Sequence, residues 1–333
     1  MLKISTAPHM SSPVNTTILM RDVIIALLPA AVVAVLFFGL NALTVIITSV
    51  TACMLCEYAL NRWVLKKPNT LRDCSAAITG LLLAYNLPSN FPIWMILIGA
   101  FVAIGITKTA FGGLGKNLFN PALVGRVFLF VSFPLQMTTW PRPKFLDFIN
   151  ADVQTGATTL GILKHLDTET SATSLTGHAT GVSNVPDYWQ MFIGYTGGCI
   201  GEVSALALIL GGLYLLKRGV INWHIPFYYI ATVFIVTSFL WLKYDSPIYD
   251  PVTHLLSGGL MLGAIFMATD YVTSPMTLNG KIIFAIGCGL LTVIIRLCGA
   301  YPEGVSFAIL IMNAFVPLID NYTRPRLFGT RRK

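Results

Sequence analysis

Apolar runs of about twenty residues alternate with short polar segments along most of this chain. An α-helix needs about 20 mostly apolar residues to cross the hydrocarbon core of a bilayer. Ten runs approach that length and predict membrane-spanning helices over residues 21–40, 43–62, 74–88, 92–109, 119–134, 193–216, 223–242, 253–269, 281–298 and 304–320. The pattern therefore predicts an all-α polytopic membrane protein.

The composition points the same way. The 333 residues are 55% hydrophobic and only 11% charged, with a mean hydropathy of +0.73, which lies outside the range of soluble domains. The first apolar run shows no small-residue cleavage site, so we expect the first helix to stay in the mature protein. All six cysteines fall in or beside apolar segments, so the sequence suggests no disulfide framework.

The charged residues predict an orientation. With ten spans and a cytoplasmic N-terminus, most of the 22 lysines and arginines fall on the cytoplasmic side, including Lys108 and the cations of the C-terminal tail 324–333. This bias is the one seen in cytoplasmic loops of membrane proteins. It places both termini in the cytoplasm and a long loop of about 135–190 outside. We interpret the net charge of +8 as topology and contact with anionic lipid, and we find no nucleic-acid motif.

The two halves of the chain share a similar order of small-residue segments and apolar runs. Residues 76–84 and the glycine-rich segment 112–117 are echoed by residues 255–263 and 298–304. Because each half has five predicted spans, the halves would insert in opposite orientations, as in transporters with inverted repeats. The alternative is that small residues only allow close helix packing. We predict a first membrane repeat over 1–134, an extracytoplasmic loop over 135–192 and a second repeat with a basic tail over 193–333.

The long loop carries the sequence Thr155-Gly156-Ala157-Thr158, with Asp152 three residues upstream. Glycine allows a backbone amide to approach a phosphate closely, and small neighbours leave room beside an exposed hydroxyl. Such a segment suits a phosphoester bond to a flavin, with Asp152 orienting the hydroxyl or helping to hold a metal during the transfer. An ordinary polar turn would have the same composition.

This motif and the segment Phe111–Arg126 together resemble the D subunits of the Rnf ferredoxin:NAD oxidoreductase complexes. They resemble less closely the B subunits of Na⁺-translocating NADH:quinone oxidoreductases. The resemblance covers nearly the whole chain, although Thr155 stands where serine is commoner. It implies a fold like that of urea and ammonium transporters and FMN esterified to Thr158.

The resemblance further implies a multi-pass protein of the inner (plasma) membrane that relays electrons in a complex pumping Na⁺ or H⁺. Its implied partners are a second covalent-FMN subunit, membrane subunits with iron–sulfur centres and an NAD-binding flavin subunit. The chain would not be catalytic alone. A solute channel or transporter of the same fold, or an assembly scaffold, remains an alternative, and neither needs a flavin.

Several further residues are candidates for function. Asn117 and Asn120 are three residues apart, which would place both carboxamides on one helical face beside Pro121 at a first helical turn. Helix capping is the simpler interpretation, whereas the quinone-reducing relatives imply a non-covalent riboflavin. Ionisable residues inside predicted spans suggest ion coupling or structural pairing. These are Glu57, Arg126, Glu202 and Arg296, with Glu303 directly before the last span as a further candidate.

Metal sites are not predicted. Cys53 and Cys56 form a C-x-x-C pair inside an apolar run, where we expect small buried hydrophobic side chains and not a redox or metal pair. The five histidines have no ligand spacing, and no haem or iron–sulfur signature is present.

Overall fold

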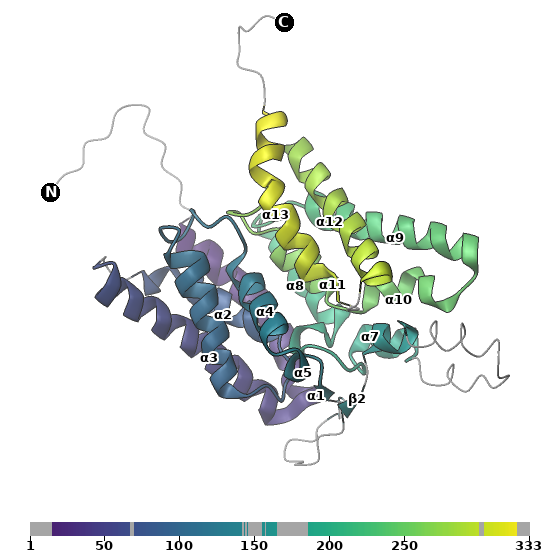
Figure 1. Ribbon diagram of the computed structural model, residues 1–333, viewed down its shortest axis with the longest axis horizontal. Helices are drawn as coiled ribbons and strands as arrows, with labels where there is room; N and C mark the ends of the chain where they lie inside the picture. The colour runs from purple at the N-terminus through teal and green to yellow at the C-terminus, as the bar shows by residue number, and fades with distance from the viewer. Residues whose placement is uncertain are drawn as a thin grey trace, which may run out of the picture.

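The protein is described here by a computed structural model covering residues 15–66, 70–141, 143, 145, 155, 156, 158–164, 186–299 and 303–324. These residues are almost entirely helical (Figure 1). The helices of the first half are α1 (Thr16–Ala59), η1 (Leu60–Val64), η2 (Leu71–Asp73), α2 (Ser75–Tyr85), α3 (Ile93–Phe101), η3 (Val102–Thr109), α4 (Pro121–Ser132) and α5 (Pro134–Met137).

Two short strands, β1 (Trp140–Pro141) and β2 (Thr155–Gly156), form an antiparallel pair between the halves. The helices of the second half are α7 (Tyr188–Ile193), η5 (Ile200–Glu202), α8 (Ala205–Lys217), α9 (His224–Tyr244), η6 (Pro247–Tyr249), α10 (Pro251–Leu256), α11 (Leu260–Leu262), η7 (Gly263–Met267), α12 (Leu278–Cys298) and α13 (Val305–Tyr322). In Figure 1, α13 ends at the top of the view, and β2 and α7 lie toward the bottom.

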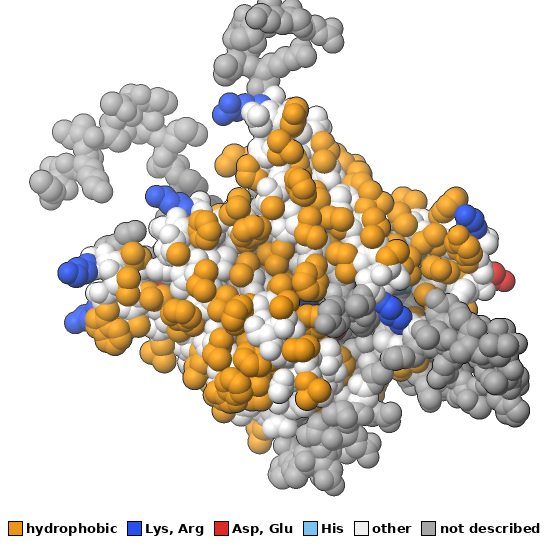
Figure 2. All heavy atoms as spheres, in the orientation of Figure 1, with side chains coloured by type: hydrophobic (Ala, Val, Ile, Leu, Met, Phe, Trp, Pro, Cys, Tyr) orange, Lys and Arg blue, Asp and Glu red, His pale blue; other side chains and the backbone are white. Residues whose placement is uncertain are grey.

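The surface is that of a membrane protein. Among the described residues, four helical stretches are long and apolar enough to cross a bilayer, namely Thr16–Val64, His224–Tyr244, Leu278–Cys298 and Val305–Tyr322. Shorter apolar helices accompany them at Ser75–Tyr85, Ile93–Thr109, Pro121–Ser132 and Ala205–Lys217. Hydrophobic side chains cover most of the visible face (Figure 2). A soluble protein rarely exposes so large an apolar area, so we conclude that the chain is a polytopic membrane protein.

The first long helix reverses its direction at Gly39, whose φ of 65° and ψ of −150° are not helical. Tyr85 near the end of α2 donates a hydrogen bond to the Leu27 carbonyl, and Ser49 donates one to the Gly80 carbonyl. Further along, Glu57 lies beside Ser75 at the start of α2, because Lys108 binds both. The segment after Gly39 is therefore antiparallel to α2 and folds back along it, so the two apolar runs 21–40 and 43–62 form separate limbs.

Two other predicted spans are not continuous helices, which corrects the sequence-based prediction. In the run 193–216, Gly194 has a φ of 132° that ends α7, and only the short 3-10 helix η5 precedes the start of α8 at Ala205. The run 253–269 is interrupted between α10 and α11, where Gly258 and Gly259 adopt φ values of 69° and 66°. Hydropathy averages over such breaks because glycine is not polar enough to interrupt an apolar window.

The halves pack closely where small residues face each other. A Cβ atom added to Gly211 in α8 would overlap the backbone carbonyl oxygen of Ala26 in α1. At Gly105 in η3, an added Cβ would meet only the side chains of Phe101 and Leu60, at 3.3 and 3.4 Å. Gly211 therefore permits a helix contact that no other residue allows.

We expect Gly211→Ala to lower the midpoint of thermal unfolding of the purified protein, since overpacking against a backbone atom costs about 1–3 kcal/mol. Gly105→Ala is the matched control. It should leave the midpoint unchanged or raise it, because alanine favours helix by about 1 kcal/mol over glycine. Equal midpoints for the two variants would contradict this account of the α1–α8 contact.

Candidate functional site

The predicted attachment segment lies between the two halves of the bundle. Thr155 and Gly156 form β2, in register with Pro141 and Trp140 of β1. Thr158 then precedes a short helix over 159–164, and its Oγ1 accepts a hydrogen bond from the Gly161 amide at 3.2 Å. Asp152 and Ala157, as well as the side chain of Thr155, lie outside the described residues.

The Thr158 side chain differs from the sequence-based expectation in one respect. The motif predicts an exposed hydroxyl, but only 9% of Thr158 is accessible. Its oxygen acts as an acceptor toward Gly161, and an ester oxygen can still accept. The Gly161 amide can therefore also donate to the oxygen of a phosphoester. The burial of Thr158, however, requires its surroundings to open when a flavin is attached.

The helix that follows Thr158 rests on the break between α10 and α11. A Cβ atom added to Gly258 would lie 2.5 Å from Cδ1 of Leu160 and 2.8 Å from Nη2 of Arg296. Lys164 donates a hydrogen bond to the Gly299 carbonyl beyond α12. The attachment segment is thus packed directly against the interrupted helix of the second half.

Arg296 stabilises that interruption. It donates to the carbonyl oxygens of His254, Ser257 and Gly258 at 2.6, 2.9 and 3.1 Å. Helix ends leave carbonyl groups without intrahelical partners, and a buried guanidinium with several donors satisfies them. Arg296, which the sequence placed in a span without a partner, therefore holds the end of α10.

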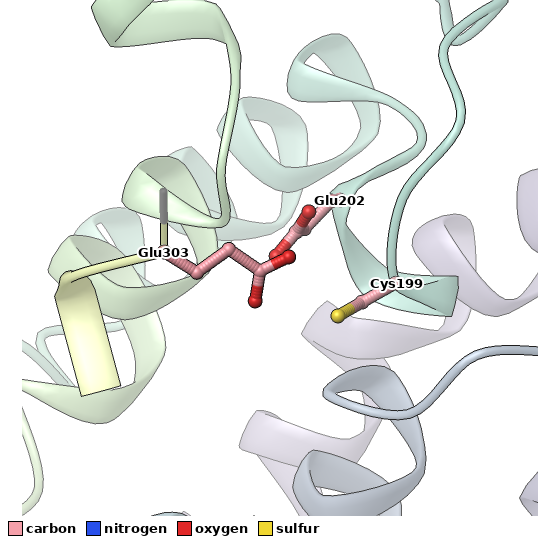
Figure 3. Close-up of side chains that lie close together, drawn as sticks. All are labelled: Cys199, Glu202 and Glu303. Atoms are coloured by element: carbon pink, nitrogen blue, oxygen red, sulfur yellow. The ribbon is translucent and has the colours of Figure 1, made fainter. Parts of the chain in front are cut away.

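A cluster of buried charges lies beside this break, around Arg126 of α4. Arg126 Nη2 forms a salt bridge with Glu303, which precedes α13, and lies 3.8 Å from Oε1 of Glu202 in η5. Its Nη1 donates to Asn86 Oδ1 and Ser306 Oγ, both at 2.7 Å. Figure 3 shows the side chains of Glu202 and Glu303 pointing toward each other, with the Cys199 sulfur turned toward them.

The structure brings together some of the predicted residues and separates others. Arg126 and Glu202 lie in one cluster, although the shorter contact of Arg126 is with Glu303. Glu57 is elsewhere: its two carboxylate oxygens each lie 3.0 Å from Nζ of Lys108. Lys108 is not the loop cation that charge counting predicts, because it is 3% exposed and sits in η3, where Ser75 Oγ accepts its third hydrogen bond at 2.7 Å.

Asn117 and Asn120 do not share a helical face, which corrects the prediction, because both precede α4. Asn120 caps α4 by accepting from the Ala122 amide at 3.1 Å, and it donates to the Met267 carbonyl at 3.3 Å. Asn117 donates to the Phe119 carbonyl at 3.1 Å. Pro121 occupies the first helical turn as expected.

Both asparagines line a cavity of about 90 Å³ that is partly open to solvent. Lys108, Ser75 and Asp270 supply further polar groups to its wall, and Leu19, Phe266 and Ile221 supply apolar ones. Apolar walls with a few convergent polar groups are typical of sites for organic ligands, although such sites usually measure roughly 300–1,000 Å³.

The cysteines agree with the simpler interpretation. Cys53 is fully buried, Cys56 is partly buried, and all six cysteines are free thiols. Within the described ranges, the group of residues that could hold a metal ion is Cys199, Glu202 and Glu303, which does not include the C-x-x-C pair.

Comparison with known proteins identifies the class first. The NQR2, RnfD, RnfE family model matches residues 3–329. This chain therefore belongs to that family of membrane proteins.

Several individual relatives are named as the D subunit of an oxidoreductase complex. The chain is 47% identical over 329 residues to the protein of Clostridium ljungdahlii named as the D subunit of a proton-translocating ferredoxin:NAD(+) oxidoreductase complex, covering 99% of this chain and 96% of the relative. It is 44% identical over 333 residues to the Na(+)-translocating counterpart of Acetobacterium woodii, with the same coverage. The D subunit of an ion-translocating oxidoreductase complex of Escherichia coli is 37% identical over 351 residues, covering 99% of both chains.

The capping role of Asn120 can be tested on its own. We expect Asn120→Ala to lower the thermal unfolding midpoint, since loss of a helix N-cap costs about 1 kcal/mol and the Met267 carbonyl also loses its donor. Asn120→Ser keeps a cap acceptor and should recover part of the loss. Asn117→Ala, which removes a contact between near neighbours in the chain, is the control, and an equal effect of the two alanine variants would contradict the capping role.

Proposed function

We propose that this chain is the D subunit of an ion-translocating ferredoxin:NAD oxidoreductase complex and carries FMN in phosphoester linkage on Thr158. The observation that carries the proposal is the match of nearly the whole chain to relatives that are named as D subunits of such complexes. The Thr155–Thr158 motif supports the cofactor and its place.

FMN, when bound, accepts and passes electrons singly or in pairs. The protein's part is to fix its position. Thr158 supplies the ester oxygen, which keeps accepting from the Gly161 amide, and the pairing of β1 with β2 anchors the chain just before it. Leu160 and Lys164 hold the following helix against Gly258 and Gly299.

The topology we propose has ten spans in two inverted repeats. Two features support it. A short helix ends in the interior of each half, at Tyr85 and at Leu256, and a glycine-containing loop precedes α4 in the first half and α13 in the second. With the lysine-rich and arginine-rich loops in the cytoplasm, both termini are cytoplasmic and Thr158 faces outward across the inner membrane. The fold is then of the urea- and ammonium-transporter kind.

Buried ionisable groups supply the means of ion coupling. Glu57 with Lys108, and Arg126 with Glu202 and Glu303, are buried groups of opposite charge inside the bundle, where an uncompensated charge is costly. We propose that Glu57, Arg126 and Glu202 belong to the route or to the device that links electron transfer to movement of Na⁺ or H⁺.

The cavity beside Asn117 and Asn120 is our candidate for a second, non-covalent flavin, riboflavin. Its mixture of apolar and polar walls supports this use, and the cavity would have to widen to admit a flavin. The protein partners that we propose are a second covalent-FMN subunit, membrane subunits with iron–sulfur centres and an NAD-binding flavin subunit. The chain acts as part of that oxidoreductase and not alone.

The test of the attachment is in-gel flavin fluorescence of the denatured, purified chain, produced in a host that flavinylates. We expect a fluorescent band for the unaltered chain and for Thr159→Ala, and complete loss of fluorescence for Thr158→Ala. Thr159 is the matched control because it is the neighbouring buried threonine. A dark band for the unaltered chain would favour a solute transporter or an assembly scaffold.

A further inference from the structure

The charged cluster around Arg126 contains carboxylate oxygens that accept no hydrogen bond. One carboxylate oxygen of Glu202, one of Glu303 and the sulfur of Cys199 lie within 4.8 Å of one another (Figure 3). The Oε1 atoms of both glutamates are buried and have no hydrogen-bond partner among the residues that the structure describes. Each glutamate side chain is only 8% exposed.

Such oxygens are unfavourable as they stand. A buried polar atom without a partner loses its hydration and gains nothing in return. Here Glu303 Oε1 has no hydrogen-bond partner, and Glu202 Oε1 has only the 3.8 Å ion-pair contact with Arg126. The two side chains point toward each other, so one small cation between them would contact both.

Neutral groups as well as the two acids hold Arg126. Its Nη1 is fixed by two neutral acceptors, Asn86 and Ser306, at 2.7 Å each. Its Nη2 faces the acids and the Cys199 sulfur, which is 3.5 Å away. The guanidinium is thus tethered through neutral groups, and its contacts with the acids can lengthen without losing that anchor.

The charges around the acids limit what can bind. Arg126 of α4 and Arg296 of α12 balance Glu202 and Glu303, and His254 of α10 lies beside Arg296. Cys199, which donates to the Asn86 carbonyl at 3.3 Å, is a further titratable group that faces them. Adding one positive charge leaves the cluster at a single excess charge, whereas a divalent ion would leave two in a region of low dielectric constant.

We infer that Glu202 and Glu303 form a binding site for one monovalent cation, a sodium ion or a proton, and that Arg126 and Arg296 balance the pair when the site is empty. As a proton, the cation forms an O–H bond on one Oε1 and is shared with the other; as sodium, it forms no covalent bond. No electrons change place in either case. The inference deepens the proposed ion-coupling role and rests on it for the use of the cation.

The site is also in contact with the attachment segment. A Cβ atom added to Gly259 would lie 2.7 Å from Glu202 Oε1. The preceding residue, Gly258, packs on Leu160. Arg296 holds the carbonyls at the same break. Leu160 and Glu202 thus pack against two adjacent glycines.

The experiment is a thermal unfolding titration of the purified full-length chain carrying Thr158→Ala, so that its outcome does not depend on a flavin. Sodium chloride replaces choline chloride at constant ionic strength, and the series is repeated over a range of pH. A ligand that binds only the folded state raises its stability. We expect a saturable rise in the unfolding midpoint with sodium, which Glu303→Gln abolishes.

Asp22→Asn is the matched control. Asp22 is a buried acid whose two oxygens are already occupied by Tyr214 and Arg218 at 3.1 to 3.2 Å, so this variant should keep the full response to sodium. If Glu303→Gln gives no folded protein, Glu202→Gln replaces it, since Glu202 makes the longer contact with Arg126.

The arms of the test separate the two cations. If sodium has no effect but the midpoint rises as the pH falls, and Glu303→Gln removes that rise, the cation is a proton. If the unaltered site and Glu303→Gln respond identically to sodium and to pH, the inference is wrong. Neither result bears on flavin attachment, which the gel experiment decides separately.

Discussion

Arg126 carries a positive charge in the interior of an apolar bundle, and the surrounding structure depends on how that charge is neutralised. The guanidinium reaches four separate parts of the chain: the end of α2 at Asn86, η5 at Glu202, the approach to α13 at Glu303, and α13 itself at Ser306. Buried ion pairs stabilise little on balance, but removing one partner is strongly destabilising. Arg126 therefore restricts which arrangement of the two halves is possible.

The need to compensate a buried charge also explains the interrupted helix. The positive charge of Arg296 is buried like that of Arg126, and it is stabilised by carbonyl oxygens that the interruption between α10 and α11 leaves free. Gly258 and Gly259 allow that interruption because both adopt left-handed backbone angles. The absence of a Cβ atom at Gly258 also admits Leu160. The segment proposed to carry FMN thus packs on a feature that satisfies a buried charge.

The features that depend on local composition could be predicted from the sequence. Apolar length locates the helices, including the two limbs that meet at Gly39, and glycine-rich segments fall where helices break. The burial of Lys108 could not be predicted, because counting charges assigns every lysine at a helix end to a loop. Arg126, Glu202 and Glu303 stand out as ionisable residues, but the sequence does not show that the closest acidic partner of Arg126 is Glu303, 177 residues away. Such contacts depend on tertiary packing, which periodicity does not record.

The attachment motif is a different case, since four small residues and a resemblance single out Thr158 but say nothing of its burial. Asn117 and Asn120 also stand out by residue type, yet their spacing suggests a helical face that the start of α4 at Pro121 rules out.

The measurement that tests the account most directly is a double-mutant cycle between Arg126→Met and Glu303→Leu, read as the free energy of unfolding in mixed micelles. Each single variant removes the shorter ion pair of Arg126 and changes the net charge of the buried cluster, and breaking a buried pair costs about 3–5 kcal/mol. The double variant should recover much of that loss, so that the coupling energy is well above the few tenths of a kcal/mol seen for independent sites, roughly 0.3–0.5. Additive effects of the two substitutions would contradict the claim that this interaction organises the bundle.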